Sequence, residues 1–244
     1  MPGRRADLAL VARGLFESRA KAKAAIEAGR VTADGKRVER PSDLIADAAV
    51  VAAEAAHPWV GRGALKLDHA LDLWPVPVQG RVVLDVGAST GGFTEVCLTR
   101  GAARVYAVDV GRGQLHARVA ADPRVVSLES VDVRALDRAR APEPCGLVVC
   151  DVSFIGLAKA LPAALALAAD GADLVALVKP QFEVGRAHIG KGGLVRDEAA
   201  RKAALDGVAA FLQSAGWAVQ ATAESPVTGG EGAVEYLLWA RKGG

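Results

Sequence analysis

Cysteine is scarce in this sequence, which has only Cys97, Cys145 and Cys150 among its 244 residues. Their spacing fits no metal-ligand pattern, and an odd number of cysteines cannot form a complete disulfide framework. We interpret all three as small buried apolar residues in a reducing compartment, and we expect no metal ion.

Long apolar runs are also missing. The longest, LPAALALAADGADLVALV, is interrupted by Asp170, Gly171 and Asp173, so we do not expect it to span a membrane. The N-terminal segment MPGRRADLALVARG is broken by Asp7 and Arg13 and does not make a secretory signal. The expectation is therefore a cytoplasmic protein that has no membrane partner.

The net charge is small as well. A formal charge of +2 excludes a strong attraction of the whole chain to nucleic acid, so any such attraction must come from a local patch. What the chain does have is apolar material, at 51% of its residues, which is ample for a core. Its length fits one large domain, or an ordinary domain with a small one attached.

The first 56 residues have the pattern of a small α+β module. Leu8, Val11, Ala12 and Leu15 recur at helical spacing. A second helix is expected over SRAKAKAAIEAG, with Ser18 as its N-cap, and RVTADGKRV predicts two short strands around an Asp-Gly turn. We expect a linker, HPWV at residues 57–60, to join this module to a second domain over residues 61–244.

The second domain alternates apolar, β-branched runs with stretches of helical length. The runs are RVVLDVG, RVYAVDV, RVVSLES, GLVVCDVS and ADLVALVKP, followed by AVQATAES and AVEYLLWARK. This alternation predicts an α/β, Rossmann-like fold, in which a mostly parallel sheet carries helices on both faces. The last two runs complete a seven-stranded sheet that closes with a hairpin.

A glycine-rich turn, LDVGASTGGFTEV, follows the first strand of this sheet and opens a helix, where backbone N–H groups can meet a ligand. Its spacing is not the G-x-G-x-x-G of dinucleotide-binding enzymes, which disfavours NAD. An acid followed by glycines looks instead like the first motif of S-adenosylmethionine-dependent methyltransferases. The residues expected at this cofactor are Asp85, Gly87, Ser89, Thr90, Gly91, Gly92, Phe93, Asp109, Asp132 and Asp151.

Two of these acids have specific expected partners on the cofactor. Asp109 ends the second strand, where a carboxylate can accept both hydroxyls of a ribose. Asp132, after the third strand, lies where the exocyclic amine of an adenine would be met. Taken alone, an aspartate in the position of Asp109 is more often a solvated strand end.

Lys179 ends the fifth strand, where Pro180 stops it, and a buried ammonium needs a partner. Asp151 ends the neighbouring fourth strand. Glu235 lies early in the last strand, which must run antiparallel and so starts at the same edge of the sheet. Lys66 comes from the helical segment before the sheet. We expect the four side chains to converge beside the methyl donor; a purely structural Lys179–Asp151 ion pair is the alternative.

These motifs together resemble one family. The blocks DVGASTGGFTEVCLTRGA, CDVSFIGL and LVKPQFEVGRAHIGKGGLVRD are similar to those of the TlyA family, also named haemolysin A. The resemblance implies methylation of a ribose 2′-hydroxyl in ribosomal RNA by a domain of the FtsJ type. It also implies a cytidine target in large-subunit RNA, with small-subunit RNA as a further candidate. The Lys-Asp-Lys-Glu tetrad of that type falls on Lys66, Asp151, Lys179 and Glu235.

A ribose hydroxyl is a poor nucleophile, which gives the tetrad its expected chemistry. Lys179, with a pKa lowered by desolvation or a neighbouring cation, would accept the hydroxyl proton or stabilise the developing alkoxide. Asp151 would position Lys179, while Lys66 and Glu235 would orient the ribose.

The N-terminal module resembles the S-four-like RNA-binding domain, and its basic residues supply the local patch that the whole chain lacks. The patch would track phosphates of a ribosomal RNA within a ribosomal subunit. A solvated helical face is the alternative interpretation. The expected RNA contacts are Arg4, Arg5, Arg13, Arg19, Lys21, Lys23, Arg30, Lys36 and Arg37.

Two other functions are open on the sequence alone. A protein that binds RNA through an inactive methyltransferase fold is the main non-enzyme alternative. A pore-forming haemolysin would need membrane-inserting segments that the sequence does not contain. The oligomeric state is not predicted.

Overall fold

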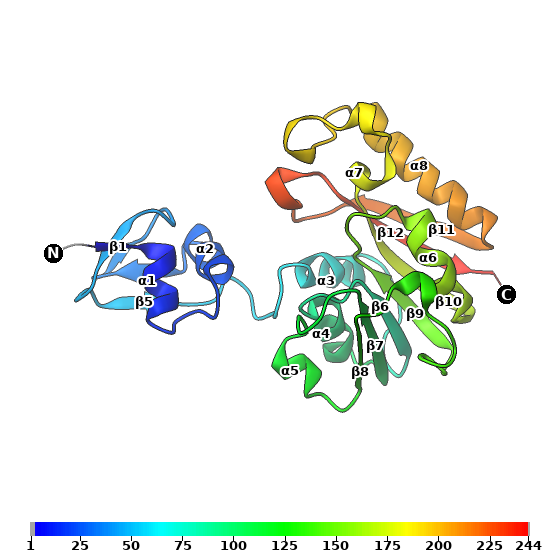
Figure 1. Cartoon of the computed structure of the whole chain (residues 1–244), viewed down its shortest axis with the longest axis horizontal. Helices are drawn as coiled ribbons and strands as arrows, with labels where there is room; N and C mark the ends of the chain where they lie inside the picture. The colour runs from blue at the N-terminus through cyan, green and yellow to red at the C-terminus, as the bar shows by residue number, and fades with distance from the viewer. Residues whose placement is uncertain (1–2, 244) are drawn as a thin grey trace. The chain divides into compact units, whose positions relative to one another are not determined.

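The computed structural model describes residues 3–243 and divides the chain into two compact units, between Pro58 and Trp59. Each unit has its own buried core. The division lies inside the segment 57–60, for which the sequence predicts a linker. Figure 1 shows the secondary structure of both units.

The first unit is a small α+β domain, as predicted. Ser18 caps α2 by accepting a hydrogen bond from the backbone N–H of Lys21, and the Asp34-Gly35 turn joins β2 to β3. Strand β1 pairs with β4, and a three-stranded sheet has the order β3-β2-β5. The elements are β1 (Gly3–Arg5), α1 (Ala6–Ala12), α2 (Arg19–Glu27), β2 (Val31–Ala33), β3 (Lys36–Arg37), β4 (Leu44–Ala46) and β5 (Val51–Ala53).

The buried face of α1 differs from the face that the spacing indicates. Leu8 is 38% exposed, and Leu15 lies beyond the end of the helix and is 42% exposed. Leu10 is fully buried instead, together with Ala6 and Ala9. The helix is only seven residues long, so the docking of its small residues against the rest of the unit decides which side is buried.

The second unit contains the predicted seven-stranded sheet, in the order β11-β12-β10-β9-β6-β7-β8. Strands β6 to β10 run parallel to one another, and β12 runs antiparallel to both β10 and β11. The strands are β6 (Val82–Val86), β7 (Arg104–Asp109), β8 (Val125–Glu129), β9 (Cys145–Cys150), β10 (Ala168–Val178), β11 (Trp217–Glu224) and β12 (Tyr236–Lys242).

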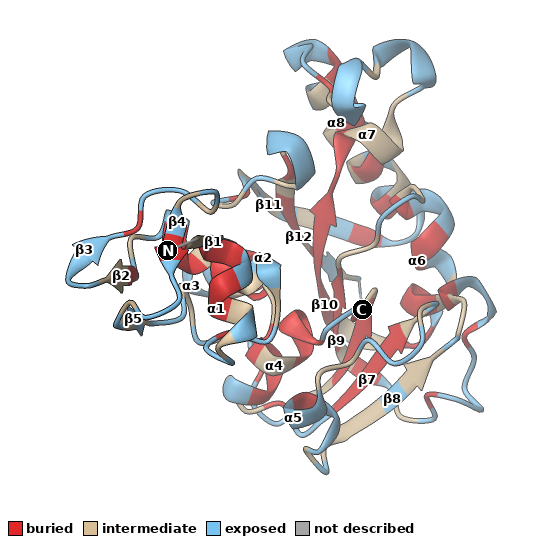
Figure 2. Cartoon of the chain, turned by 60° about the vertical axis from the view of Figure 1, so that its left-hand side comes forward, coloured by how far each residue is buried: buried red, intermediate tan, exposed pale blue. Residues whose placement is uncertain are grey.

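Helices cover both faces of this sheet. Helices α3 and α4 pack on one face, and α6 and α8 pack on the other, so residues of both orientations along the central strands are buried (Figure 2). The helices are α3 (Ala64–Leu73), α4 (Gly92–Thr99), α5 (Ala117–Ala120), α6 (Leu157–Ala166), α7 (Pro180–Glu183) and α8 (Glu198–Ser214), with 3-10 turns at Val133–Ala135, Arg186–His188, Lys191–Gly193 and Gly230–Gly232.

The register of four strands determines where the site lies. Cys150 at the end of β9 is level with Val86 at the end of β6, and Val178 at the end of β10 pairs with Tyr236 at the start of β12. The residues that follow or precede these positions therefore share one edge of the sheet. In parallel α/β sheets, ligands bind at this carboxyl edge.

Candidate active site

The turn between β6 and α4 requires glycine at two positions. Gly87 has φ +85°, and a Cβ there would lie 2.6 Å from the carbonyl oxygen of Asp151. Gly91 has φ +90°, and a Cβ would lie 2.8 Å from Leu115 Cδ1. Only glycine allows this conformation with such close approach. The two glycines consequently let the turn lie directly against Asp151 and Leu115.

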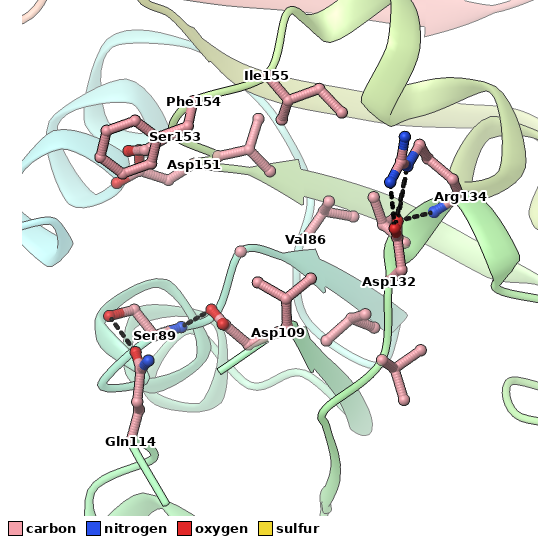
Figure 3. Close-up of a pocket in the computed structure, with 16 residues that line it drawn as sticks. Val86, Ser89, Asp109, Gln114, Asp132, Arg134, Asp151, Ser153, Phe154 and Ile155 are labelled. Atoms are coloured by element: carbon pink, nitrogen blue, oxygen red, sulfur yellow. Dashed lines mark hydrogen bonds and ion pairs between the residues drawn. The ribbon is translucent and has the colours of Figure 1, made fainter. Parts of the chain in front are cut away.

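Asp109, at the end of β7, is fixed by backbone N–H groups. Ser89 N donates to its Oδ2 at 2.7 Å (Figure 3), and Gly111 N donates to its Oδ1 at 2.7 Å. Gln114 lies beside them, with its Oε1 3.4 Å from Ser89 Oγ. Each carboxylate oxygen retains a further acceptor site, so Asp109 can still accept two ribose hydroxyls.

A cavity of about 450 Å³ opens between Asp109 and the end of β9. Val110, Val131, Val133 and Ile155 give it apolar walls. A volume in this range, with apolar walls and a few polar groups, is typical of cofactor sites. Together with the glycine turn and Asp109, the cavity fits the adenosine part of S-adenosylmethionine.

Asp132 lines the same cavity but already has a strong partner. Its carboxylate accepts a hydrogen bond from the backbone N–H of Arg134 at 2.9 Å and pairs with the guanidinium at 2.5 Å (Figure 3). The Arg134 guanidinium lowers the pKa of Asp132 to about 2. An adenine amine would therefore have to share this carboxylate with Arg134.

A second cavity of about 200 Å³ adjoins the first, because Gly87, Ser89, Asp151 and Ser153 line both. Its other walls include Lys179. The two cavities thus lead from the Asp109 carboxylate to the Lys179 ammonium. A methyl donor held along this path would place its reactive end near the lysine.

The four tetrad residues form two ion pairs. Lys179 Nζ lies 2.5 Å from Asp151 Oδ1, and Lys66 Nζ donates to Glu235 Oε2 at 2.5 Å. Both lysines and Glu235 are buried. Glu235 directly precedes β12, and its neighbour Tyr236 pairs with Val178. The strand register thus brings Lys179, Asp151 and Glu235 to one edge of the sheet.

Asp85 lies under the glycine turn and lines neither cavity. It is completely buried, and its Oδ2 accepts a hydrogen bond from Thr94 Oγ1 at 2.6 Å. Burial raises its pKa from 3.8 to about 7, although the Thr94 hydrogen bond acts in the opposite direction. Oδ1 has no hydrogen-bond partner within the described part of the chain. Its contact with the methyl donor therefore remains a prediction.

Most of the other residues predicted at the cofactor face one of the two cavities. Gly91 lines neither cavity, and a Cβ on it would meet Leu115. Those that face a cavity are Gly87, Ser89, Thr90, Gly92, Phe93, Asp109, Asp132 and Asp151.

Comparison with known proteins decides the family. Residues 59–242 match the FtsJ-like methyltransferases, and residues 4–51 match the S4 domain. The chain is 47% identical to the 16S/23S rRNA (cytidine-2'-O)-methyltransferase TlyA of Mycobacterium tuberculosis, over 97% of this chain and 89% of that protein. The chain belongs to the TlyA family of FtsJ-like methyltransferases.

Two further relatives agree with this assignment. Hemolysin A of Brachyspira hyodysenteriae is 35% identical over 92% of this chain and 94% of its own length. A solved structure from Streptococcus thermophilus, provisionally described as a hemolysin, superposes with a TM-score of 0.78 at 39% identity and covers 100% of this chain and 90% of that one. The predicted TlyA resemblance and Rossmann-like fold are confirmed.

In the S4 domain of this TlyA family member, most of the predicted RNA contacts already have partners. Arg5 and Arg19 both pair with the buried Asp7 and lower its pKa to about 2. Arg13 donates to three backbone carbonyls. The remaining pairs are Lys21–Glu17, Lys23–Glu27, Arg30–Glu54 and Arg37–Glu39.

Arg4 and Lys36 are different. Both are exposed, and neither forms an ion pair with another residue in the range 3–243. They are therefore the two predicted contacts whose charges are most available to RNA phosphates.

Two residues of the TlyA-type site were not foreseen from the sequence. Ser153 accepts a hydrogen bond from Lys179 Nζ at 3.0 Å. Phe154 is 90% exposed at the rim of the larger cavity and has φ +69°, which is unusual for a non-glycine residue. Their position two and three residues after Asp151, in a strand-to-helix loop, was the available indication.

Two structural absences complete the description. Residues 3–243 contain no group of three or more histidine, cysteine, aspartate or glutamate side chains arranged to hold a metal ion. In the same range, no helix has the length and apolar character needed to cross a membrane.

Proposed function

We propose that this protein methylates the ribose 2′-hydroxyl of a cytidine in ribosomal RNA, with S-adenosylmethionine as the methyl donor. The observation that carries the proposal is the pairing of Lys179 with Asp151 at the end of a cavity that starts at Asp109 and the glycine turn. S-adenosylmethionine supplies an electrophilic methyl group when it is bound. The protein's residues have to hold the donor and present the hydroxyl to it in line.

The donor site uses the two walls of the cavity. Asp109 accepts the donor's ribose hydroxyls, since its carboxylate is already oriented by Ser89 and Gly111. The apolar walls hold the adenine ring, with Asp132 at its amine. The amides of the glycine turn face the amino-acid end.

The two ion pairs have different roles toward the RNA. Lys179 stabilises the negative charge that develops on the 2′-oxygen, and the Asp151 carboxylate paired with it accepts the hydroxyl proton. Lys66 and Glu235 orient the target ribose. Because Lys66, Lys179 and Glu235 are buried, their charges act with less screening from solvent than those of surface pairs.

The exposed ring of Phe154 gives the target nucleoside an apolar surface at the rim of the cavity. A base that is rotated out of its stack can lie against such a ring. This arrangement would leave the ribose of that nucleotide facing the tetrad.

Each predicted domain has its own role. Residues 1–56 bind RNA, residues 57–60 link the two domains, and residues 61–244 catalyse the methyl transfer. RNA binding rests mainly on Arg4 and Lys36, because the other basic residues of the first domain are paired within it. Substrate RNA within an assembled subunit, and hence a cytoplasmic location, are part of this proposal.

The M. tuberculosis relative is named for both 16S and 23S RNA, so either subunit is a candidate substrate. The test is transfer of a tritiated methyl group from S-adenosylmethionine to separated large and small subunits. Wild type is measured beside Lys179→Ala and beside Lys202→Ala, which changes an exposed lysine on α8.

Label in at least one subunit RNA, lost in Lys179→Ala and kept in Lys202→Ala, supports the proposal. Absence of label in both subunits, with S-adenosylmethionine still bound by wild type, would favour the alternative of an RNA-binding protein with an inactive fold.

A further inference from the structure

Two segments beside the proposed active site lie against each other and make a series of contacts. The first is the loop 151–156, which connects β9 to α6, and the second is residues 179–183, which follow β10. Lys179 Nζ donates to Ser153 Oγ at 3.0 Å, and the rings of Phe182 and Phe154 have centroids 5.3 Å apart. Both segments carry a tetrad residue, Asp151 in one and Lys179 in the other.

Glu183 makes the last contact of this series. Its Oε1 accepts a hydrogen bond from the backbone N–H of Leu157, the first residue of α6, at 2.9 Å. The residue at the N-cap of α6 is Gly156, which has no side chain to cap the helix. The first N–H groups of a helix have no acceptor inside it, so Glu183 supplies one from another element.

The packing around this contact is close. A Cβ on Gly156 would lie 3.0 Å from Glu183 Oε2 and 3.1 Å from the carbonyl oxygen of Phe182. Glycine at position 156 therefore lets the carboxylate reach the start of α6. Burial raises the pKa of Glu183, while the Leu157 N–H acts in the opposite direction. The loop between Asp151 and α6 is thus held at both ends by the segment that carries Lys179.

We propose that Glu183 is a positioning residue of the methyltransferase site, whose carboxylate caps α6 and thereby fixes the loop 151–156 against Lys179. This inference rests on the proposed function, because it assigns Glu183 to the alignment of that reaction. Without the cap, Ser153 and Phe154 lose the anchor at the far end of their loop. Asp109 and the glycine turn are held by other contacts and keep their geometry.

The experiment compares wild type with Glu183→Ala, Glu183→Gln and a control, Asp197→Ala. Asp197 is the matched control because its carboxylate also caps a helix, accepting from the backbone N–H of Ala199 at 3.0 Å at the start of α8. For each protein, kcat and KM are measured with ribosomal subunits. The Kd for S-adenosylhomocysteine is measured by calorimetry, and the folded state is checked by circular dichroism.

We expect Glu183→Ala to lower kcat at least about tenfold, because misplacement of reacting groups by about 1 Å is enough for losses of this size. S-adenosylhomocysteine affinity should fall less than kcat does, since the Asp109 wall is intact although Ile155 of the loop lines the same cavity. Glu183→Gln keeps an acceptor oxygen and should restore most of kcat. Asp197→Ala should behave as wild type.

Three results would overturn the inference: a folded Glu183→Ala protein with the kcat of wild type, an equal loss in Asp197→Ala, or a Glu183→Gln protein as impaired as Glu183→Ala. If Glu183→Ala does not fold, the glutamine variant decides, since a tenfold loss there removes the capping role. If wild type itself methylates no ribosomal RNA, the proposed function has failed, which is a separate outcome from failure of the Glu183 assignment.

Discussion

Asp85 should make the stability of the catalytic domain depend on pH. The carboxyl group is completely buried, and burial raises its pKa from 3.8 to about 7. Between these two values the folded protein keeps the Asp85 proton, whereas the unfolded chain releases it. Because the folded state then binds more protons, the free energy of unfolding falls as pH rises through this window.

The magnitude follows from the size of the pKa change. A rise of about 3 pKa units corresponds to a free energy of unfolding that is lower by about 4 kcal/mol above pH 7 than it would be with a side chain that stays neutral. Asp85→Asn is such a side chain, and its amide oxygen can still accept from Thr94 Oγ1. The stability advantage of Asp85→Asn over wild type should therefore grow by about 2–3 kcal/mol between pH 5 and pH 8.

Urea unfolding followed by tryptophan fluorescence measures this directly. All four tryptophans, Trp59, Trp74, Trp217 and Trp239, lie in the second unit, so the signal reports on the catalytic domain. The control is Asp137→Asn, which changes a half-exposed carboxylate paired with Arg140. A difference between wild type and Asp85→Asn that is the same at pH 5 and pH 8 would refute the reasoning.

Three further predictions concern the site and the RNA-binding domain. Lys66→Met leaves Glu235 buried without a cation and should lower the free energy of unfolding by about 3–5 kcal/mol. The double variant Lys66→Met, Glu235→Leu should regain stability but not methyl transfer. A Lys66→Met protein as stable as wild type would contradict this. Gly87→Ala places a Cβ 2.6 Å from a backbone oxygen at φ +85°, which strains the turn. Calorimetry should therefore show S-adenosylhomocysteine affinity reduced by about tenfold or more. Unchanged affinity would count against the turn as part of the donor site. Lys36→Glu should weaken RNA binding and make the slope of log K against log salt concentration smaller by about 1. Arg30→Glu should have a smaller effect, because the native Arg30 side chain already pairs with Glu54. Equal effects of the two variants would show that the ion pairs inside the domain do not reduce RNA binding.

The sheet and much of the site were predictable because they depend on sequence-local patterns. The alternation of strands and helices predicts the parallel sheet, and the antiparallel last strand then brings Glu235 to the edge that holds Asp151 and Lys179. The glycine spacing identifies the turn in the same way. None of these inferences needs the positions of individual side chains.

The remaining features depend on contacts between distant residues. The Arg19–Asp7 pair joins α2 to α1, and the hydrogen bond from Leu157 to Glu183 joins α6 to α7 across 26 residues of sequence. The buried face of α1 depends on which of its short side chains dock, a choice that helical spacing does not determine. The strained backbone of Phe154 has no local indication in the sequence either.

The central claim is that the methyl group goes to a ribose oxygen. Ribosomal RNA methylated by the wild-type protein can be digested to nucleosides and analysed by mass spectrometry, with RNA treated by Lys179→Met as the reference. We predict 2′-O-methylcytidine in the wild-type sample only. A methyl group on a base, or 2′-O-methylcytidine formed equally by Lys179→Met, would contradict the assignment of the lysine and the chemistry based on it.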